Sequence, residues 1–287
     1  MTNYCTLADV RTERKTDSTD TSDDAQLRRY IAQVSHRIDS TMGPRMRPYF
    51  APYLETRQYL ITSRDVDSYR NTLTMRDYCL ALTAVVRGST TITSSTELYT
   101  PYNNVAQALR ITNWSSSWYD DLAGNDIPPA FVQVTAYWGW HEDYSNAWAA
   151  VDTVKDGAGI NATVATITVD NADGADLDGF TPRFSPGNLI KIDDEFMDVT
   201  ATDTALNTLT VRRARNGTTA AAHLVNAPIS VYQVDERVRR IATRQAALLY
   251  SRQGAFQVES LDGVGVVTYP QDLLVELRGV LTEFQYG

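Results

Sequence analysis

The sequence has few of the residues on which disulfide-rich domains and metal centres depend. Its 287 residues include two cysteines and three histidines. Cys5 and Cys79 can form at most one disulfide, which excludes a disulfide-based scaffold, and we expect both thiols to stay reduced in a cytoplasmic compartment. The histidines, His36, His141 and His223, are scattered and lack the spacing of a metal site. We therefore expect neither a bound metal nor another cofactor.

Long apolar runs and catalytic motifs are also missing. No segment approaches the roughly twenty apolar residues that a membrane-spanning helix needs. The first six residues contain no apolar signal core, so we expect synthesis in the cytoplasm and no membrane association. The sequence has no phosphate-binding P-loop, no Gly-x-Ser-x-Gly elbow and no HExxH-type pair. These absences predict that the protein is not an enzyme.

The charge of the chain is negative and unevenly distributed. The formal net charge is −9. Between Glu142 and Val211 there are thirteen acidic and three basic side chains, so the rest of the chain is close to neutral. An acidic surface repels phosphate, which disfavours sequence-specific binding of DNA or RNA. It is compatible with a protein that surrounds DNA without gripping it.

Helical patterns occur near both ends of the chain. Asp23 and Gln26 have the spacing of a capping box, and apolar residues then recur at helical spacing as far as Ile38, before Gly43 ends the helix. The helical period returns after Val234, with one apolar face. The arginines of that second segment are expected on its other faces: Arg237, Arg239, Arg240, Arg244 and Arg252.

The residues between these helices favour short β-strands. The clearest alternation covers residues 131–140. Farther along, Asp193-Asp194-Glu195 is typical of a tight hairpin turn, and short strands separated by turn residues indicate a small barrel or sandwich. The other expected strands cover residues 56–61, 80–86, 90–93, 108–114, 163–169, 189–192, 196–199, 208–211 and 229–232.

These patterns predict an α+β protein with two domains. Residues 1–151 and 234–287 would form one discontinuous helical domain with a small antiparallel sheet. Residues 152–233 would form an inserted all-β module shaped as a barrel or sandwich. The chain is long enough for each part to bury its own core.

Several short motifs follow one another in a particular order. The chain opens with Thr6-Leu7-Ala8-Asp9, continues with the capped helix and the strand that contains Arg57, and then has residues 129–135 leading into Trp138-Gly139-Trp140, before the closing arginine-rich helix. This order resembles the head–tail adaptor (connector) proteins of long-tailed bacteriophages. Residues 186–195, 209–213 and 216–223 resemble a β-module of phage structural proteins. Typical adaptors lack so large an insertion, which leaves the role of the module open.

The resemblance implies a virion structural protein at the head–tail junction. Members of the family form a ring, usually of twelve copies, below the portal vertex. The ring contacts the portal protein on one side and a neck, stopper or tail-completion protein on the other, and genomic DNA passes through its centre without specific binding. The same arrangement is expected here.

Two groups of residues are candidates for these contacts. Arg237, Arg240 and Arg244 would form salt bridges between subunits or with the portal. The C-terminal tail is too apolar for a segment without a partner, so it either docks into the portal or packs on its own domain. Its candidate docking residues are Phe256, Leu273, Leu274, Leu277, Leu281, Phe284 and Tyr286.

Other interpretations are open from the residues. The acidic segment 170–179 has carboxylates for calcium but fits no EF-hand register, so a solvated loop is favoured. The carboxylates of the turn at 193–195 would mostly point into water rather than form a glycosidase pair. The main rival is a carbohydrate-binding or cell-surface-binding protein that uses the β-module and exposed tryptophans, although aromatic residues more often fill a core or an interface. The aromatic group comprises Trp114, Trp118, Tyr137, Trp138, Trp140 and Trp148.

Overall fold

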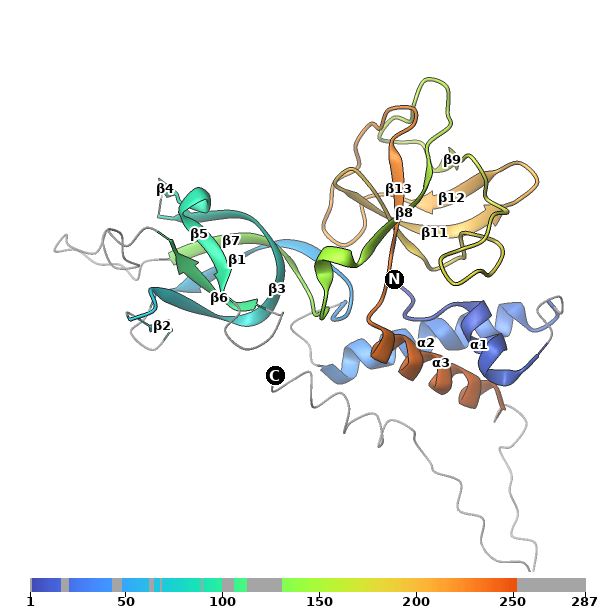
Figure 1. Ribbon diagram of the computed structural model, residues 1–287, viewed down its shortest axis with the longest axis horizontal. Helices are drawn as coiled ribbons and strands as arrows, with labels where there is room; N and C mark the ends of the chain where they lie inside the picture. The colour runs from blue at the N-terminus through green and yellow to red at the C-terminus, as the bar shows by residue number, and fades with distance from the viewer. Residues whose placement is uncertain are drawn as a thin grey trace, which may run out of the picture.

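The computed structural model describes residues 2–16, 21–42, 48–61, 65–67, 69–88, 90–99, 106–112 and 131–251. These residues form two antiparallel sheets and three α-helices. Figure 1 shows one sheet, here sheet A, as a separate lobe. The second, sheet B, lies above the layer of helices, and the N-terminus lies between sheet B and that layer.

Sheet A has seven strands, of which five follow the order β1-β7-β3-β6-β5, while β2 and β4 pair with β3. In β7 the side chains of Val132, Val134, Ala136 and Trp138 are buried and the intervening ones lie on the opposite face and are more exposed, as the two-residue period of a strand requires. The strands are β1 (Tyr53–Leu60), β2 (Val66–Asp67), β3 (Thr72–Arg87), β4 (Thr90–Thr91), β5 (Thr96–Tyr99), β6 (Ala106–Ile111) and β7 (Phe131–Trp138).

Sheet B has six strands in the order β8-β13-β10-β11-β12-β9. Its own core includes Ile190, Met197 and Leu209. The hairpin between β10 and β11 turns at Asp193 and Asp194, as the sequence predicted. The strands are β8 (Trp148–Thr153), β9 (Thr166–Thr168), β10 (Leu189–Ile192), β11 (Glu195–Asp203), β12 (Thr208–Arg212) and β13 (Pro228–Tyr232).

The helical layer consists of α1 (Leu7–Arg14), α2 (Asp24–Met42) and α3 (Glu236–Ser251). Both α1 and α2 pack on α3. On α2 the apolar residues at helical spacing, including Leu27, Ile31 and Ile38, are buried as the pattern predicts. None of the described helices is long and apolar enough to cross a membrane.

The main core joins all three parts. It combines the buried faces of the helices and sheet A with Leu189, Phe196 and Tyr232 of sheet B. The N-terminal segment lies within this junction, because Tyr4 is fully buried and the backbone N–H of Asn3 donates to the carbonyl oxygen of Gly187 at 3.2 Å. Sheet B is therefore packed against the helices and sheet A.

The predicted fold class was wrong. The described residues form mostly β-structure with three helices, and the expected helical domain with a small sheet is not present. The difference arises largely in β3, where the sequence indicated a strand only at residues 80–86. Its earlier half buries Leu73, Met75 and Cys79 on alternate positions, but Asp77 occupies the same series and interrupts the apolar pattern. The predicted division into domains at residues 152 and 233 stays a prediction.

Candidate functional site

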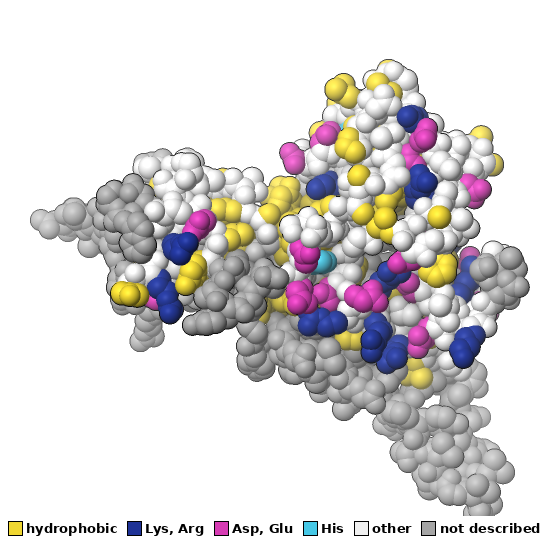
Figure 2. Space-filling view, viewed as in Figure 1, with side chains coloured by type: hydrophobic (Ala, Val, Ile, Leu, Met, Phe, Trp, Pro, Cys, Tyr) yellow, Lys and Arg dark blue, Asp and Glu magenta, His cyan; other side chains and the backbone are white. Residues whose placement is uncertain are grey.

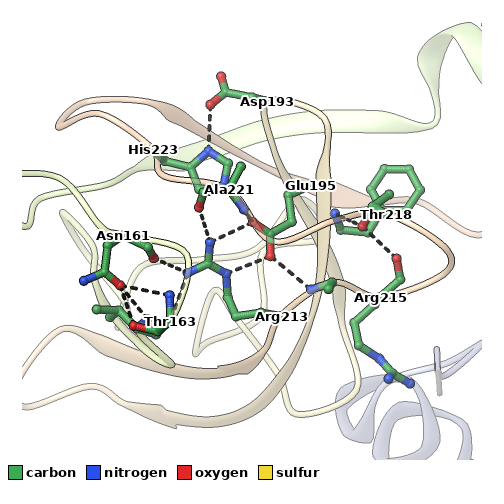
Figure 3. Close-up of polar contacts among 12 residues, drawn as sticks. Asn161, Thr163, Asp193, Glu195, Arg213, Arg215, Thr218, Ala221 and His223 are labelled. Atoms are coloured by element: carbon green, nitrogen blue, oxygen red, sulfur yellow. Dashed lines mark hydrogen bonds and ion pairs between the residues drawn. The ribbon is translucent and has the colours of Figure 1, made fainter.

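The most extensive network of buried polar contacts surrounds Glu195 at the start of β11 (Figure 3). Its carboxylate has no solvent exposure and accepts two hydrogen bonds from Arg213, from Nε to Oε1 and from Nη2 to Oε2, each 2.7 Å long. The backbone N–H groups of Ala214 and Ala221 donate to it at 3.0 and 2.8 Å. The Nε2 atom of His223 lies 3.0 Å from Oε2. The carboxylate is thus surrounded by donors.

These donors determine the ionisation of Glu195. Burial raises its pKa, but the hydrogen bonds from Arg213, from two backbone N–H groups and from His223 outweigh burial and lower the pKa to about 2. The carboxylate therefore stays ionised at neutral pH. A group that holds no proton at neutral pH cannot act as a general acid there.

His223 lies between two carboxylates, with Nδ1 2.7 Å from Oδ2 of Asp193 and Nε2 next to Glu195. A neutral imidazole has one N–H and can donate to only one of them. The neighbouring hydroxyl of Thr218 donates to the carbonyl oxygen of Arg215 at 2.8 Å and accepts from the N–H of Phe196 at 3.0 Å. This hydroxyl is occupied by the backbone, so the cluster contains no histidine–hydroxyl pair of the kind that nucleophilic catalysis uses.

Arg213 connects this cluster to two loops. Its Nη1 donates to the carbonyl oxygens of Asn161 at 2.8 Å and Val164 at 2.9 Å, and its Nη2 donates to that of Ala221 at 2.5 Å. The five N–H groups of a guanidinium suit such a junction between backbone segments. The network therefore fixes the loops of sheet B in place, and sequence analysis missed it because its members are far apart along the chain.

The turn carboxylates lie differently from expectation. These carboxylates were expected to point mostly into water. Asp194 is exposed, and Asp193 is 60% exposed although its Oδ2 contacts His223. Glu195 is buried because its side chain, at the start of β11, faces inward. In the acidic loop, Asp176 accepts from the backbone N–H groups of Asp178 and Phe180 at 3.0 and 2.8 Å. Across the described residues, no three His, Cys, Asp or Glu side chains are grouped so that they could hold a metal ion.

A second charged junction joins the helices to sheet B. The guanidinium of Arg239 on α3 pairs with Asp9 on α1, Nη2 to Oδ1 at 2.5 Å and Nε to Oδ2 at 3.1 Å, and also pairs with Asp178. Burial lowers the pKa of Arg239, but the hydrogen bonds to both carboxylates outweigh it and raise the pKa. Asp9 also accepts from the N–H of Thr6 at 2.7 Å, which completes the capping box of α1. The opening Thr-Leu-Ala-Asp motif thus has a structural role in this chain.

A small cavity lies beside this junction. Its volume is about 60 Å³, and it is lined by the N-terminal segment, by the loop at residues 176–178 and by Arg183 and Arg239. A cavity of this kind has room for ordered water.

The three arginines predicted at subunit contacts differ in their surroundings. Arg237 pairs with Glu142 at 2.6 Å and Asp235 at 3.3 Å within the same chain. The Nε atom of Arg244 lies 3.6 Å from Oε1 of Glu13 on α1. Arg240 is exposed, and no ion pair of Arg240 is found among the described residues. Arg240 is therefore the one most available to another molecule.

Most of the exposed large apolar side chains occupy the outer ends of the sheets. Leu60 and Phe131, 39% and 48% exposed, face each other at one end of the β1–β7 pair. Leu206 and Leu224 lie in loops of sheet B with 69% and 79% of their surfaces exposed. Figure 2 shows apolar side chains at the outer loops of sheet B, and neighbouring basic and acidic side chains along the helical layer.

The described tryptophans belong mainly to the core. Trp138 is buried, and Trp140 is 7% exposed. Trp148 is half-buried, and its ring stacks on Phe196 with 5.0 Å between the ring centroids. Nζ of Lys191 lies 4.7 Å from the centroid of the Trp148 ring. Trp114, Trp118 and the tail residues Phe256, Leu273, Leu274, Leu277, Leu281, Phe284 and Tyr286 lie outside the described residues.

Comparison with known proteins adds no assignment. No model of a protein family matches the chain, and no curated protein matches its sequence.

Proposed function

We propose that this protein is a head-to-tail adaptor of a virion, which forms a ring below the portal and links the capsid to the neck or tail. The observation that carries the proposal is the location of exposed apolar side chains at the outer ends of both sheets. Leu60 and Phe131 lie opposite each other on β1 and β7 and together offer a small apolar surface for contact with another protein.

The shape of the described chain fits several simultaneous contacts. Sheet A, sheet B and the helical layer extend in different directions from one junction (Figure 1). Closed rings need two different surfaces on each subunit, because the contact repeats head to tail around the axis. Ends that point in different directions provide such surfaces, with further surfaces for the portal protein and for a neck, stopper or tail-completion protein.

The charge of the chain fits a channel that DNA crosses without specific binding. The net charge of −9 does not favour retention of a polyanion. Arg240 on α3 is the exposed cation that we assign to a neighbouring subunit or to the portal, with Arg244 beside it. The mature location would be the head–tail junction of the virion.

We do not propose glycan binding as the function. A sugar site would need an exposed aromatic face for stacking, whereas Trp138 is buried and Trp148 packs on Phe196. The described tryptophans therefore give the rival interpretation little support.

The test is light scattering with negative-stain imaging of the purified protein, alone and mixed with its candidate portal protein. Rings, or portal assemblies that carry one additional ring, are the expected result. Arg240→Glu would lower the yield of these assemblies, while Arg212→Glu, an exposed position on β12, serves as the matched control. A protein that stays monomeric and ignores the portal at high concentration would contradict the proposal.

A further inference from the structure

Within the part of the chain that the structure describes, the outer edge of β1 has no partner along half of its length. β1 lies at the end of the strand order of sheet A and pairs only with β7. At one end its edge is occupied, because the N–H of Leu54 donates to the carbonyl oxygen of Asn216 at 2.8 Å. Backbone groups alternate in direction along a strand, so those of Thr56, Gln58 and Leu60 point to the same side as that of Leu54. Among the described residues, none pairs with these three.

The contacts of β7 give the same alternation independently. The carbonyl oxygen of Phe131 accepts from the N–H of Gly88, on the β3 side of the sheet. The backbone N–H and C=O groups of Val132, Val134 and Ala136 therefore point toward β1. These three residues pair with Tyr59, Arg57 and Glu55. This leaves the N–H groups at 56, 58 and 60 directed away from β7.

The side chains on one face of this edge, those of Leu54, Thr56, Gln58 and Leu60, are uncharged. Four cross-strand pairs form the outer face of β1 and β7, and they consist of leucine, threonine, glutamine, phenylalanine and tyrosine. Natural sheets usually protect an open edge with charged side chains. The charged residues of β1, Glu55 and Arg57, belong to the other face. There Nε of Arg57 lies 2.8 Å from Oε2 of Glu55, and Nη1 of Arg57 lies 2.8 Å from Oδ2 of Asp77. The pairs are Leu54–Tyr137, Thr56–Thr135, Gln58–Gln133 and Leu60–Phe131.

One segment of the chain matches this edge in length and character. Residues 263–269, Gly-Val-Gly-Val-Val-Thr-Tyr, carry no charge and are rich in β-branched and aromatic residues. Asp262 precedes them, and Pro270, which cannot continue a sheet ladder, follows. Five residues of β1, 56–60, are available for pairing, and a seven-residue segment is long enough to cover them.

The direction of α3 favours a second copy as the source of this segment. α3 runs away from sheet A and ends at Ser251, on the far side of the helical layer (Figure 1). Sixteen residues of helix cover about 24 Å. The eleven residues 252–262 span at most about 40 Å when fully extended, and they would have to return along α3 before they reached β1 of the same chain.

We propose that residues 263–269 of a second copy add as an extra strand to the free edge of β1. The added strand would receive hydrogen bonds from Thr56, Gln58 and Leu60 and extend sheet A across the subunit boundary. This inference rests on the proposed ring and names one contact within it. Each copy would give a segment to one neighbour and accept a segment from the other, which is the head-to-tail contact that a ring requires.

Cysteine cross-linking between full-length chains tests the proposal. One chain carries Leu60→Cys and the other carries Val264→Cys, Val266→Cys or Thr268→Cys, three positions on one side of a strand. The native thiols Cys5 and Cys79 are buried and contribute little background. After mild oxidation of the mixture, we expect a two-chain disulfide with at least one of the tail positions. Ala32→Cys, exposed on α2, replaces Leu60→Cys in the control mixture.

A proline at residue 58 distinguishes strand addition from general proximity. The N–H of Gln58 points away from β7, so Gln58→Pro removes a donor from the open edge without removing a β1–β7 hydrogen bond. In the Leu60→Cys chain it should reduce the yield of cross-linked dimer at least about tenfold, while Gln58→Ala keeps the yield. An unchanged circular dichroism spectrum would show that the proline variant is folded.

Two results would overturn the inference: no cross-link at any tail position, or equal yields with Gln58→Pro and Gln58→Ala. Imaging separates these failures from failure of the proposed function. Rings that form normally with Gln58→Pro would reject the strand contact and leave the adaptor role supported. A wild-type protein that forms no ring, alone or with a portal, would reject the adaptor role whatever the cross-linking shows.

Discussion

At the scale of single residues, a buried ion pair connects the loops of sheet B to its strands. Arg213 and Glu195 are almost fully buried and satisfy each other with two parallel hydrogen bonds. Removing one partner of such a pair leaves an uncompensated charge in the interior, which costs far more than the pair itself contributes. This asymmetry makes Glu195 the most sensitive position of the network.

Glu195→Gln should lower the free energy of unfolding by about 3–5 kcal/mol, because Arg213 stays charged and buried without its partner. Urea denaturation followed by circular dichroism measures the loss. Asp173→Asn, an exposed acidic position of the same sheet's loops, should change it by less than about 0.5 kcal/mol. Equal effects of the two substitutions would contradict the role assigned to the pair.

The same carboxylate should make stability depend on pH under acidic conditions. Its pKa falls from an ordinary value of 4.5 to about 2 in the folded protein, so its contribution is complete above about pH 4.5 and is lost as the pH falls toward 2. The difference in unfolding free energy between wild type and Glu195→Gln should therefore shrink between pH 5 and pH 2.5. A difference that stays constant across this range would show that Glu195 titrates normally.

At the scale of elements, the first helix depends on its cap. α1 has eight residues, too few to be stable alone, and it is held by the capping box of Thr6 and by Arg239. Thr6→Ala should destabilise the protein by about 1 kcal/mol, since the N–H of Asp9 loses its acceptor, and Thr6→Ser should retain most of the stability. Equilibrium denaturation of the two variants compares them directly. A Thr6→Ser variant as unstable as Thr6→Ala would exclude the cap as the cause.

Elements with a strong apolar period could be predicted from the sequence. α2 and α3 were found because their buried residues recur every three or four positions. α1 was missed, since only Val10 is buried on it and its stability comes from caps and charges. The length of β3 was underestimated for a related reason: Asp77 lies on its inward-facing series and finds its partner, Arg57, on another strand.

The candidate site residues show the same limit. The spacing of arginines on α3 predicted an exposed charged face, and Arg240 is exposed. Arg239, the adjacent residue, instead pairs with Asp9 and Asp178, which are remote in the sequence. A pattern within one helix shows which face is polar, but the partner of each charge depends on tertiary contacts.

At the scale of the whole molecule, side chains of sheet B and its loops donate hydrogen bonds to the backbone just before β1. The hydroxyl of Tyr232 donates to the carbonyl oxygen of Phe50 at 3.1 Å. The side chain of Asn216 donates to the carbonyl oxygen of Pro52 at 3.0 Å. Contacts between residues more than 160 positions apart follow from the tertiary fold and leave no pattern in the local sequence. We infer from them that the described parts unfold together.

Gly217 tests this coupling. It has a positive φ of +80°, and a Cβ at this position would overlap the carbonyl oxygen of Leu54 on β1. Gly217→Ala should force the loop of sheet B away from β1 and break the hydrogen bond between Leu54 and Asn216. We expect calorimetry to show one transition for the wild type, and for the variant a lower melting temperature with a van't Hoff enthalpy below the calorimetric one.

The matched control separates backbone strain from the lost contact. Gly179 has a similar φ of +86°, but a Cβ there would meet no atom within 4 Å. Gly179→Ala therefore carries the strain of a left-handed alanine without a clash, and its transition should stay single with a modest decrease in melting temperature. If both variants unfold in one transition with equal loss of stability, the contact at Leu54 does not couple the sheets. If only Gly217→Ala separates the transitions, the junction transmits stability between sheet A and sheet B, and a strand added to the open edge of β1 would stabilise both.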